Sequence, residues 1–190
     1  MGQSPTLVNY CRQGNIEEAR KLIEGGANVN EKDGEYQYSP LHLAVREGHL
    51  DLTRLLIQSG ANLQAKLSYG YSPLHTAAKA NQYDCAMALL EAGAQVDAFD
   101  DMHDTPMHVA AREGCIDIAL LLIDYGADIE LKERYGRKPI ECFPLPAQQK
   151  YVNEYIANTE NEEPVELADQ REPIELSSHE TRDDFVNLPE

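Results

Sequence analysis

The chain carries the segment Ser39-Pro40-Leu41-His42-Leu43-Ala44 three times in closely similar form. The second copy is Ser72-Pro73-Leu74-His75-Thr76-Ala77, and the third is Thr105-Pro106-Met107-His108-Val109-Ala110. They start at residues 39, 72 and 105, so the period is 33 residues. One period later, Lys138-Pro139-Ile140-Glu141-Cys142-Phe143 keeps the proline and the aliphatic residue but not the hydroxyl or the histidine. A constant period of this length predicts a solenoid, because one such unit cannot bury its apolar face alone.

Each copy contains the signals of a helix that begins at its proline. The Ser or Thr before the proline can cap a helix, and proline suits the first helical position. A residue suited to a left-handed turn follows, and a second apolar run then ends in a Gly-Ala pair. The turn residues are Gly48, Asn81 and Gly114, and the pairs are Gly60-Ala61, Gly93-Ala94 and Gly126-Ala127. The pattern predicts two short helices per unit, with a projecting hairpin between units.

The period and the motif resemble those of the ankyrin-repeat family, whose repeats carry Thr-Pro-Leu-His-x-Ala. The resemblance implies an all-α solenoid of helix pairs with projecting β-hairpin loops. We expect about five repeats over residues 4–157, starting near residues 5, 39, 72, 105 and 138, with the first and last as degenerate caps. We expect Pro5 to begin the first helix and Pro144-Leu145-Pro146 to interrupt the last repeat. Residues 147–157 then predict a helix that covers the open end.

Composition restricts the class of function. The net charge is −17, which argues against direct binding of nucleic acid. No apolar run is long enough to span a membrane. The four cysteines show neither Cys-x-x-Cys spacing nor a disulfide framework, and they predict reduced thiols. We therefore expect a monomeric intracellular protein in the cytoplasm, with the nucleus or a host cytosol as alternatives.

The two ends of the chain carry further signals. The first six residues match an N-myristoylation pattern at Gly2, although one acyl chain anchors a protein weakly. Residues 158–190 are acidic and predict a disordered tail. The tail holds Glu163-Pro164-Val165-Glu166-Leu167 and, nine residues later, Glu172-Pro173-Ile174-Glu175-Leu176. These segments are either paired linear motifs, with Pro164, Leu167, Pro173 and Leu176 as contacts, or chance similarity within a biased composition.

The recurring histidines do not predict catalysis or metal binding. His42, His75 and His108 should lie about 10 Å apart in successive repeats, too far to share one metal ion. In the ankyrin resemblance this histidine hydrogen-bonds the local backbone and the capping hydroxyl. The chain also lacks a Ser-His-Asp arrangement, a glycine-rich phosphate loop and zinc-ligand spacing. We expect no enzyme activity, no metal and no cofactor.

The candidate binding residues lie at the predicted hairpin tips and on the first helices. The tip residues are Tyr36, Tyr38, Tyr69, Tyr71, Met102 and Tyr135. Exposed tyrosine and methionine are typical of protein-binding surfaces, and the alternative is that the rings pack on neighbouring hairpins. Arg46, Lys79 and Arg112 form a stripe on the concave side, either as a binding surface or as solvated charges.

The resemblance implies a non-catalytic intracellular module that binds a protein through its hairpin tips and concave face. Such a module acts as an adaptor or an inhibitor, like the ankyrin inhibitors of nuclear factor kappa B or of cyclin-dependent kinases. One alternative is a regulatory protein whose acidic tail carries linear motifs or occupies the basic stripe. Another is a host-directed effector of a virus or intracellular bacterium. An enzyme would need a nucleophile and a base converging in one pocket.

Overall fold

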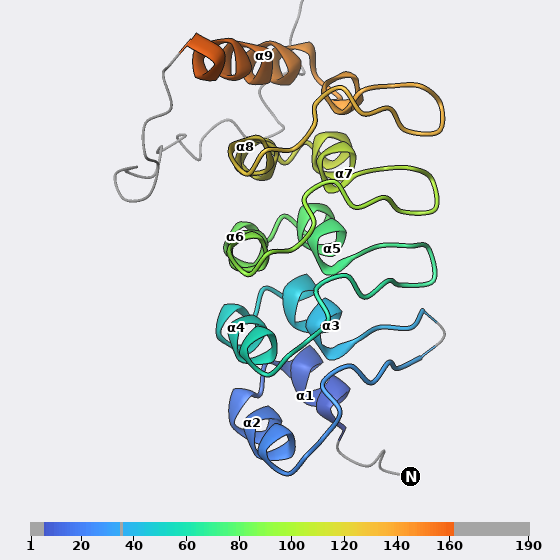
Figure 1. Ribbon diagram of the computed structural model, residues 1–190, viewed down its shortest axis with the longest axis vertical. Helices are drawn as coiled ribbons and strands as arrows, with labels where there is room; N and C mark the ends of the chain where they lie inside the picture. Colours follow the sequence, from blue (N-terminus) through green and yellow to red (C-terminus); the bar gives the residue numbers. More distant parts are fainter. Residues whose placement is uncertain (1–5, 35, 162–190) are drawn as a thin grey trace, which may run out of the picture.

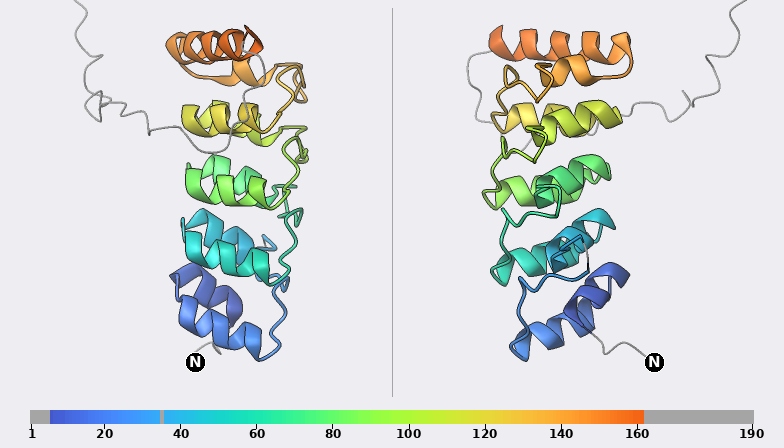
Figure 2. Two further views of the ribbon diagram at one scale, coloured as in Figure 1. Left: turned by 60° about the vertical axis from the view of Figure 1, so that its left-hand side comes forward. Right: turned by 90° about the vertical axis from the view of Figure 1, so that its right-hand side faces the viewer.

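The computed structural model describes residues 6–34 and 36–161, which form a column of stacked helix pairs with loops on one side (Figure 1). The elements are α1 (Leu7–Gln13), α2 (Ile16–Glu24), α3 (Pro40–Arg46), α4 (Leu50–Gln58), α5 (Pro73–Lys79), α6 (Tyr83–Glu91), α7 (Pro106–Glu113), α8 (Ile116–Asp124), the 3₁₀ turn η1 (Pro139–Cys142) and α9 (Pro146–Asn161). The inner helices α1, α3, α5 and α7 lie beside the loops, and the outer helices α2, α4, α6 and α8 lie on the far side. Figure 2 shows the same column from two further directions. The predicted all-α solenoid is confirmed.

The inner helices begin where a hydroxyl side chain caps them. Ser39, Ser72 and Thr105 each accept a hydrogen bond from the N–H of the histidine three residues on, and proline follows each cap. In the first repeat the cap is Thr6, which accepts from the N–H of Asn9 at 3.3 Å. The expectation that Pro5 begins α1 was therefore wrong, because the helix starts one residue after Thr6. Pro5 itself lies outside the described residues.

The recurring histidines join each repeat to the next. The backbone N–H of Ser72 donates to Nδ1 of His75 at 3.2 Å, so the ring proton is on Nε2. Nε2 then donates to the carbonyl oxygen of Asp104 at 3.0 Å, in the following hairpin. His42 and His108 bond to the carbonyls of the following hairpins in the same way. Local capping by histidine is confirmed, and the bond between repeats is an addition that the sequence did not predict.

The core consists of small and aliphatic side chains between the helix layers. Ala44, Ala77 and Ala110 are fully buried, which lets successive inner helices pack closely. At the C-terminal end Val152 of α9 is fully buried, and Ile156 packs against the same core. The predicted interruption is also found, since η1 ends at Cys142 and α9 begins at Pro146. Helix α9 runs to Asn161, beyond the expected end at residue 157.

Candidate protein-binding groove

Each loop closes as a short hairpin, and no β-strand forms in residues 6–34 or 36–161. The N–H of Leu67 donates to the carbonyl of Tyr71 at 2.9 Å, and the next two hairpins repeat this bond one and two periods later. The first hairpin has one extra residue, because its closing bond runs from Asp33 to Tyr38. The first hairpin is therefore one residue longer than the other three.

Backbone hydrogen bonds also join neighbouring hairpins. They run from the N–H of Ser68 to the carbonyl of Tyr36 (3.2 Å), from Asp101 to Tyr69 (3.3 Å) and from Arg134 to Met102 (3.1 Å). The three acceptors are 33 residues apart, so Tyr36 is equivalent to Tyr69 and Met102 despite the extra residue. These bonds tie the hairpins into one wall beside the inner helices.

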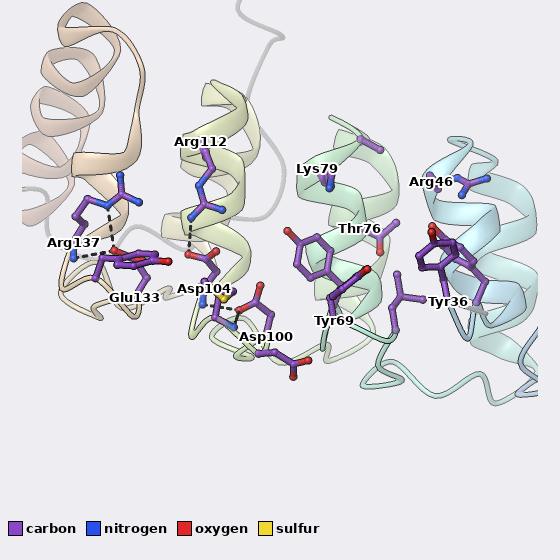
Figure 3. Close-up of a pocket in the computed structure, with 17 residues that line it drawn as sticks. Tyr36, Arg46, Tyr69, Thr76, Lys79, Asp100, Asp104, Arg112, Glu133 and Arg137 are labelled. Carbon is purple, nitrogen blue, oxygen red and sulfur yellow. Dashed lines mark hydrogen bonds and ion pairs between the residues drawn. The ribbon is translucent and has the colours of Figure 1, made fainter. Parts of the chain in front are cut away.

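A groove of about 710 Å³ lies between this wall and helices α3, α5 and α7 (Figure 3). All nine candidate residues line it: Tyr36, Tyr38, Tyr69, Tyr71, Met102, Tyr135, Arg46, Lys79 and Arg112. The groove also contains residues that the sequence analysis did not select: Leu67, Thr76, Ala80, Asp100, Asp101, Asp104, Glu133 and Arg137. The structure therefore brings the tip residues and the basic stripe into one site.

The tyrosines of the groove differ in their packing. Tyr69 and Tyr135 keep 66% and 72% of their surface exposed, whereas Tyr38 and Tyr71 are half-buried. The Tyr36 ring lies 6.2 Å from that of Tyr38 and 6.3 Å from that of Tyr69. Packing between hairpins thus accounts for part of the tyrosine content, but it leaves two rings open to a ligand.

The basic stripe is held in place by a pairing that recurs in three repeats. The guanidinium carbon of Arg46 lies 5.0 Å from the ring centroid of Tyr38, eight residues earlier. Nζ of Lys79 lies 5.4 Å from the centroid of Tyr71 in the equivalent pair. Two repeats thus place a cation on a tyrosine ring, which attracts it by cation–π interaction.

In the next repeat the equivalent partner is a carboxylate. Arg112 donates to Oδ1 of Asp104 at 2.7 Å, and this hydrogen bond raises the pKa of Arg112. Asp104 is 3% exposed. Arg137 likewise donates to Oε1 of the buried Glu133 at 3.1 Å. Both carboxylates are buried with a partner, as a buried charge requires.

Asp100 shapes the neighbouring hairpin. One oxygen, Oδ1, accepts from the N–H of Met102 at 2.7 Å and from that of Asp104 at 2.8 Å. The residue between them, His103, has a left-handed φ of 61° where the equivalent loops have Gly70 and Gly136. The Asp100 side chain therefore stabilises a turn that has histidine at the left-handed position where the equivalent turns have glycine.

The four cysteines of the described chain are buried and unpaired. Burial raises the pKa of all four cysteine thiols, to about 12 for Cys11. In residues 6–34 and 36–161 no group of three or more His, Cys, Asp or Glu side chains is placed to hold a metal ion. In the same residues no helix is both long and apolar enough to cross a bilayer. Gly2 and the tail residues Pro164, Leu167, Pro173 and Leu176 lie outside the described residues.

A family model described as ankyrin repeats (3 copies) matches residues 2–67 and 61–133. A search of curated proteins found no match. The family match covers the first four helix pairs and the hairpins that form most of the groove.

Proposed function

The chain belongs to the ankyrin-repeat family, and from this we propose that it is a non-catalytic module that binds a partner protein along its groove. Ankyrin repeats are in general protein-interaction modules, and function within such a family depends on the particular site. Here the site is the concave surface formed by the hairpin wall and helices α3, α5 and α7 (Figure 3).

The observation that carries this proposal is the exposure of Tyr69 and Tyr135 along the same groove as Arg46 and Lys79. Tyrosine and arginine are enriched at the energetic centres of protein interfaces, because they offer large contact area together with polar groups. These two rings are the most exposed tyrosines of the described residues, and they share one groove with two cations. A protein ligand along the groove can cover both rings.

A catalytic role has little support in the described residues. The recurring histidines use both ring nitrogens in structural hydrogen bonds, as His75 does with Ser72 and Asp104. The four thiols are buried and unpaired, and burial raises their pKa, so they are weak nucleophiles. Buried free thiols also support a reducing, intracellular location.

We propose that the module acts as an adaptor or an inhibitor. The groove runs along the solenoid, so its ligand contacts several repeats at once and lies beside the rigid hairpin wall. A segment held in this way is withdrawn from other partners, which is inhibition, or is fixed beside another protein, which is adaptation. Both roles begin with the same binding step, which is the step to test first.

The acidic tail offers a second candidate, in which residues 158–190 mask the groove. One observation favours it: Lys79 has no carboxylate within 4.0 Å in the described part of the chain. One observation limits it, because Arg112 already pairs with the buried Asp104. A synthetic peptide of residues 162–190, added in trans, should then compete with a groove ligand.

The binding proposal can be tested with a random peptide library displayed on phage and selected on the immobilised full chain. Enriched peptides are titrated against the wild type and against a groove variant that combines Tyr69→Ala and Tyr135→Ala. The control variant combines Tyr83→Ala and Tyr125→Ala, two tyrosines of the outer helix layer that are 42% and 41% exposed.

We expect the groove variant to bind at least tenfold more weakly, because loss of an interface tyrosine costs about 1–2 kcal/mol. The control variant should bind as the wild type does. Equal binding by the wild type and the groove variant would refute the proposal, and far-ultraviolet circular dichroism would show that both variants fold.

A further inference from the structure

We infer that the groove is electrically polarised along the solenoid and recognises an extended partner segment whose anionic side chain lies between Arg46 and Lys79. The inference rests on the proposed function and adds the chemistry of the partner. It follows from which charges of the groove are cancelled within the chain and which are not.

The cations at the α3–α5 end have no buried carboxylate partner in the described residues, unlike those at the other end. Lys79 is placed by the face of Tyr71, and a ring attracts a cation without neutralising it. Arg46 is placed in the same way by Tyr38, and its only carboxylate partner in the described chain is Glu47 at 2.7 Å. The Glu47 side chain is 38% exposed, and an exposed pair of this kind is weak enough for a ligand to replace.

The charges at the α7–η1 end are cancelled or negative. Arg112 and Arg137 pair with carboxylates whose side chains are 5% and 1% exposed, so each positive charge is offset by a buried carboxylate that a ligand cannot readily displace. Asp101 also lines this end with an exposed side chain, whereas Asp100 is buried, and no cation of the described residues lies within 4.0 Å of either. The groove is therefore positive near α3 and α5 and negative near the hairpin of Asp100.

The order of these residues along the groove is visible in Figure 3, where Arg46 and Lys79 come first, then Asp100 and Asp104, then Glu133. Arg46 and Lys79 occupy equivalent positions in adjacent repeats, so they are separated by about 10 Å. One anionic side chain entering between them is within reach of both flexible cations.

The partner is therefore an extended segment that carries an acidic residue and, further along, a basic residue that meets the exposed Asp101. The basic residue belongs to the same segment because the negative end lies in the same groove. Complementary charge of this kind fixes the direction in which a peptide binds. A carboxylate and a phosphate share the required chemistry, and the experiment distinguishes them.

The test uses the full chain and the tightest peptide from the library selection. That peptide is compared with two derivatives: one with its acidic residue replaced by the matching amide, and one with phosphoserine at that position. Each is titrated against the wild type, Arg46→Met, Lys79→Met and the control Arg54→Met, which removes an exposed cation from outer helix α4.

We expect Arg46→Met and Lys79→Met each to weaken binding about fivefold and Arg54→Met to leave it unchanged. The amide derivative should bind the wild type about fivefold more weakly, and it should lose less affinity relative to the parent peptide on Arg46→Met and on Lys79→Met, because each of these variants has already lost part of the same interaction. Retained or tighter binding of the phosphoserine derivative would support the same anion site and identify phosphate as a source.

Three results would overturn the inference. If the amide derivative binds as the parent does while Tyr69→Ala and Tyr135→Ala abolish binding, the groove binds peptides without an anion site. If a peptide of residues 162–190 displaces the selected peptide in a Lys79-dependent manner, the tail of the chain and not a partner supplies the anion. If the variant with Tyr69→Ala and Tyr135→Ala binds the selected peptide as tightly as the wild type does, or if no peptide is enriched, the proposed function itself fails.

Discussion

Gly70 and Gly136 occupy equivalent places in two hairpins, and we predict that replacing them with alanine has unequal cost. Both have left-handed backbones, with φ of 79° and 83°. A Cβ at Gly136 would meet nothing within 4 Å. A Cβ at Gly70 would lie 2.7 Å from the backbone nitrogen of Asp101, closer than real Cβ contacts allow.

The magnitude follows from what the Gly70→Ala change must move. The left-handed strain, about 1 kcal/mol, and the lower entropy of the unfolded chain affect both variants and cancel in the comparison. At Gly70 the hairpin must also shift away from Asp101, whose N–H donates to the Tyr69 carbonyl at 3.3 Å. Loss of one such hydrogen bond costs about 1 kcal/mol. Gly70→Ala should therefore lower the free energy of unfolding by about 1 kcal/mol more than Gly136→Ala.

The assay is urea unfolding followed by circular dichroism, with midpoints compared at equal m-values. Adding Asp101→Ala to Gly70→Ala should not restore stability, because the nearest fixed contact is the Asp101 backbone. Equal destabilisation by the two alanine variants, or rescue by Asp101→Ala, would refute the claim that backbone contact between hairpins sets the cost.

Three further predictions concern charge, pH and backbone conformation. Arg112→Met should lower the free energy of unfolding by about 2 kcal/mol, because it leaves the buried Asp104 carboxylate without its cation, and adding Asp104→Asn should recover most of the loss in urea unfolding. Burial lowers the pKa of His42 to about 4, so the unfolded chain binds a proton between pH 6.5 and 4 that the folded chain does not. The free energy of unfolding should therefore decrease as the pH is lowered through that window. For this group the decrease from pH 7 to pH 5 is about 2 kcal/mol. Gln37 has a left-handed φ of 58°, so Gln37→Gly should raise the thermal midpoint, by about 0.5 kcal/mol in stability.

Each of these has a clear contrary outcome. If the double variant Arg112→Met with Asp104→Asn does not recover the stability lost in Arg112→Met, the arginine stabilises the fold by packing rather than by charge. A His42 ring that titrates near 6.5 in the folded protein, observed by nuclear magnetic resonance, would contradict the burial argument. A lower midpoint for Gln37→Gly would show that the side chain contributes more than the backbone strain costs.

The regular parts of the fold were predictable because each signal is local. A hydroxyl residue before a proline sets the start of α3, α5 and α7, and the residues at 48, 81 and 114 set the turns that follow. The same logic misplaces the first helix. Pro5 predicts a start at residue 5, whereas the hydroxyl of Thr6 supplies the cap and the helix begins at Leu7.

The sequence predicted which tyrosines and cations line the groove, but it did not predict how the charges along the groove are paired. The recurrence of Arg46, Lys79 and Arg112 predicted a basic stripe, and all three residues line the groove. The carboxylates of Asp104 and Glu133 were missed because each pairs with a cation that alone resembles surface charge. The signal was present in the sequence, since the residue eight positions before each cation is tyrosine, tyrosine and then aspartate.

The bonds between repeats could not be read from local pattern. The partner of His75 is the carbonyl of Asp104, 29 residues later, and any residue type can supply a carbonyl. The backbone bond from Asp101 to Tyr69 is equally independent of side-chain identity. Such contacts follow only from the distance at which repeats stack, which the alanines of the inner helices set.

The most direct test of groove binding is the amide spectrum of the isotope-labelled full chain during titration with a selected peptide. We predict shift changes along the hairpins at 66–71, 99–104 and 132–137 and on helices α3, α5 and α7, with the outer helices α4, α6 and α8 unchanged. Shift changes concentrated on the outer helices, with the signals of Tyr69 and Tyr135 unmoved, would contradict groove binding.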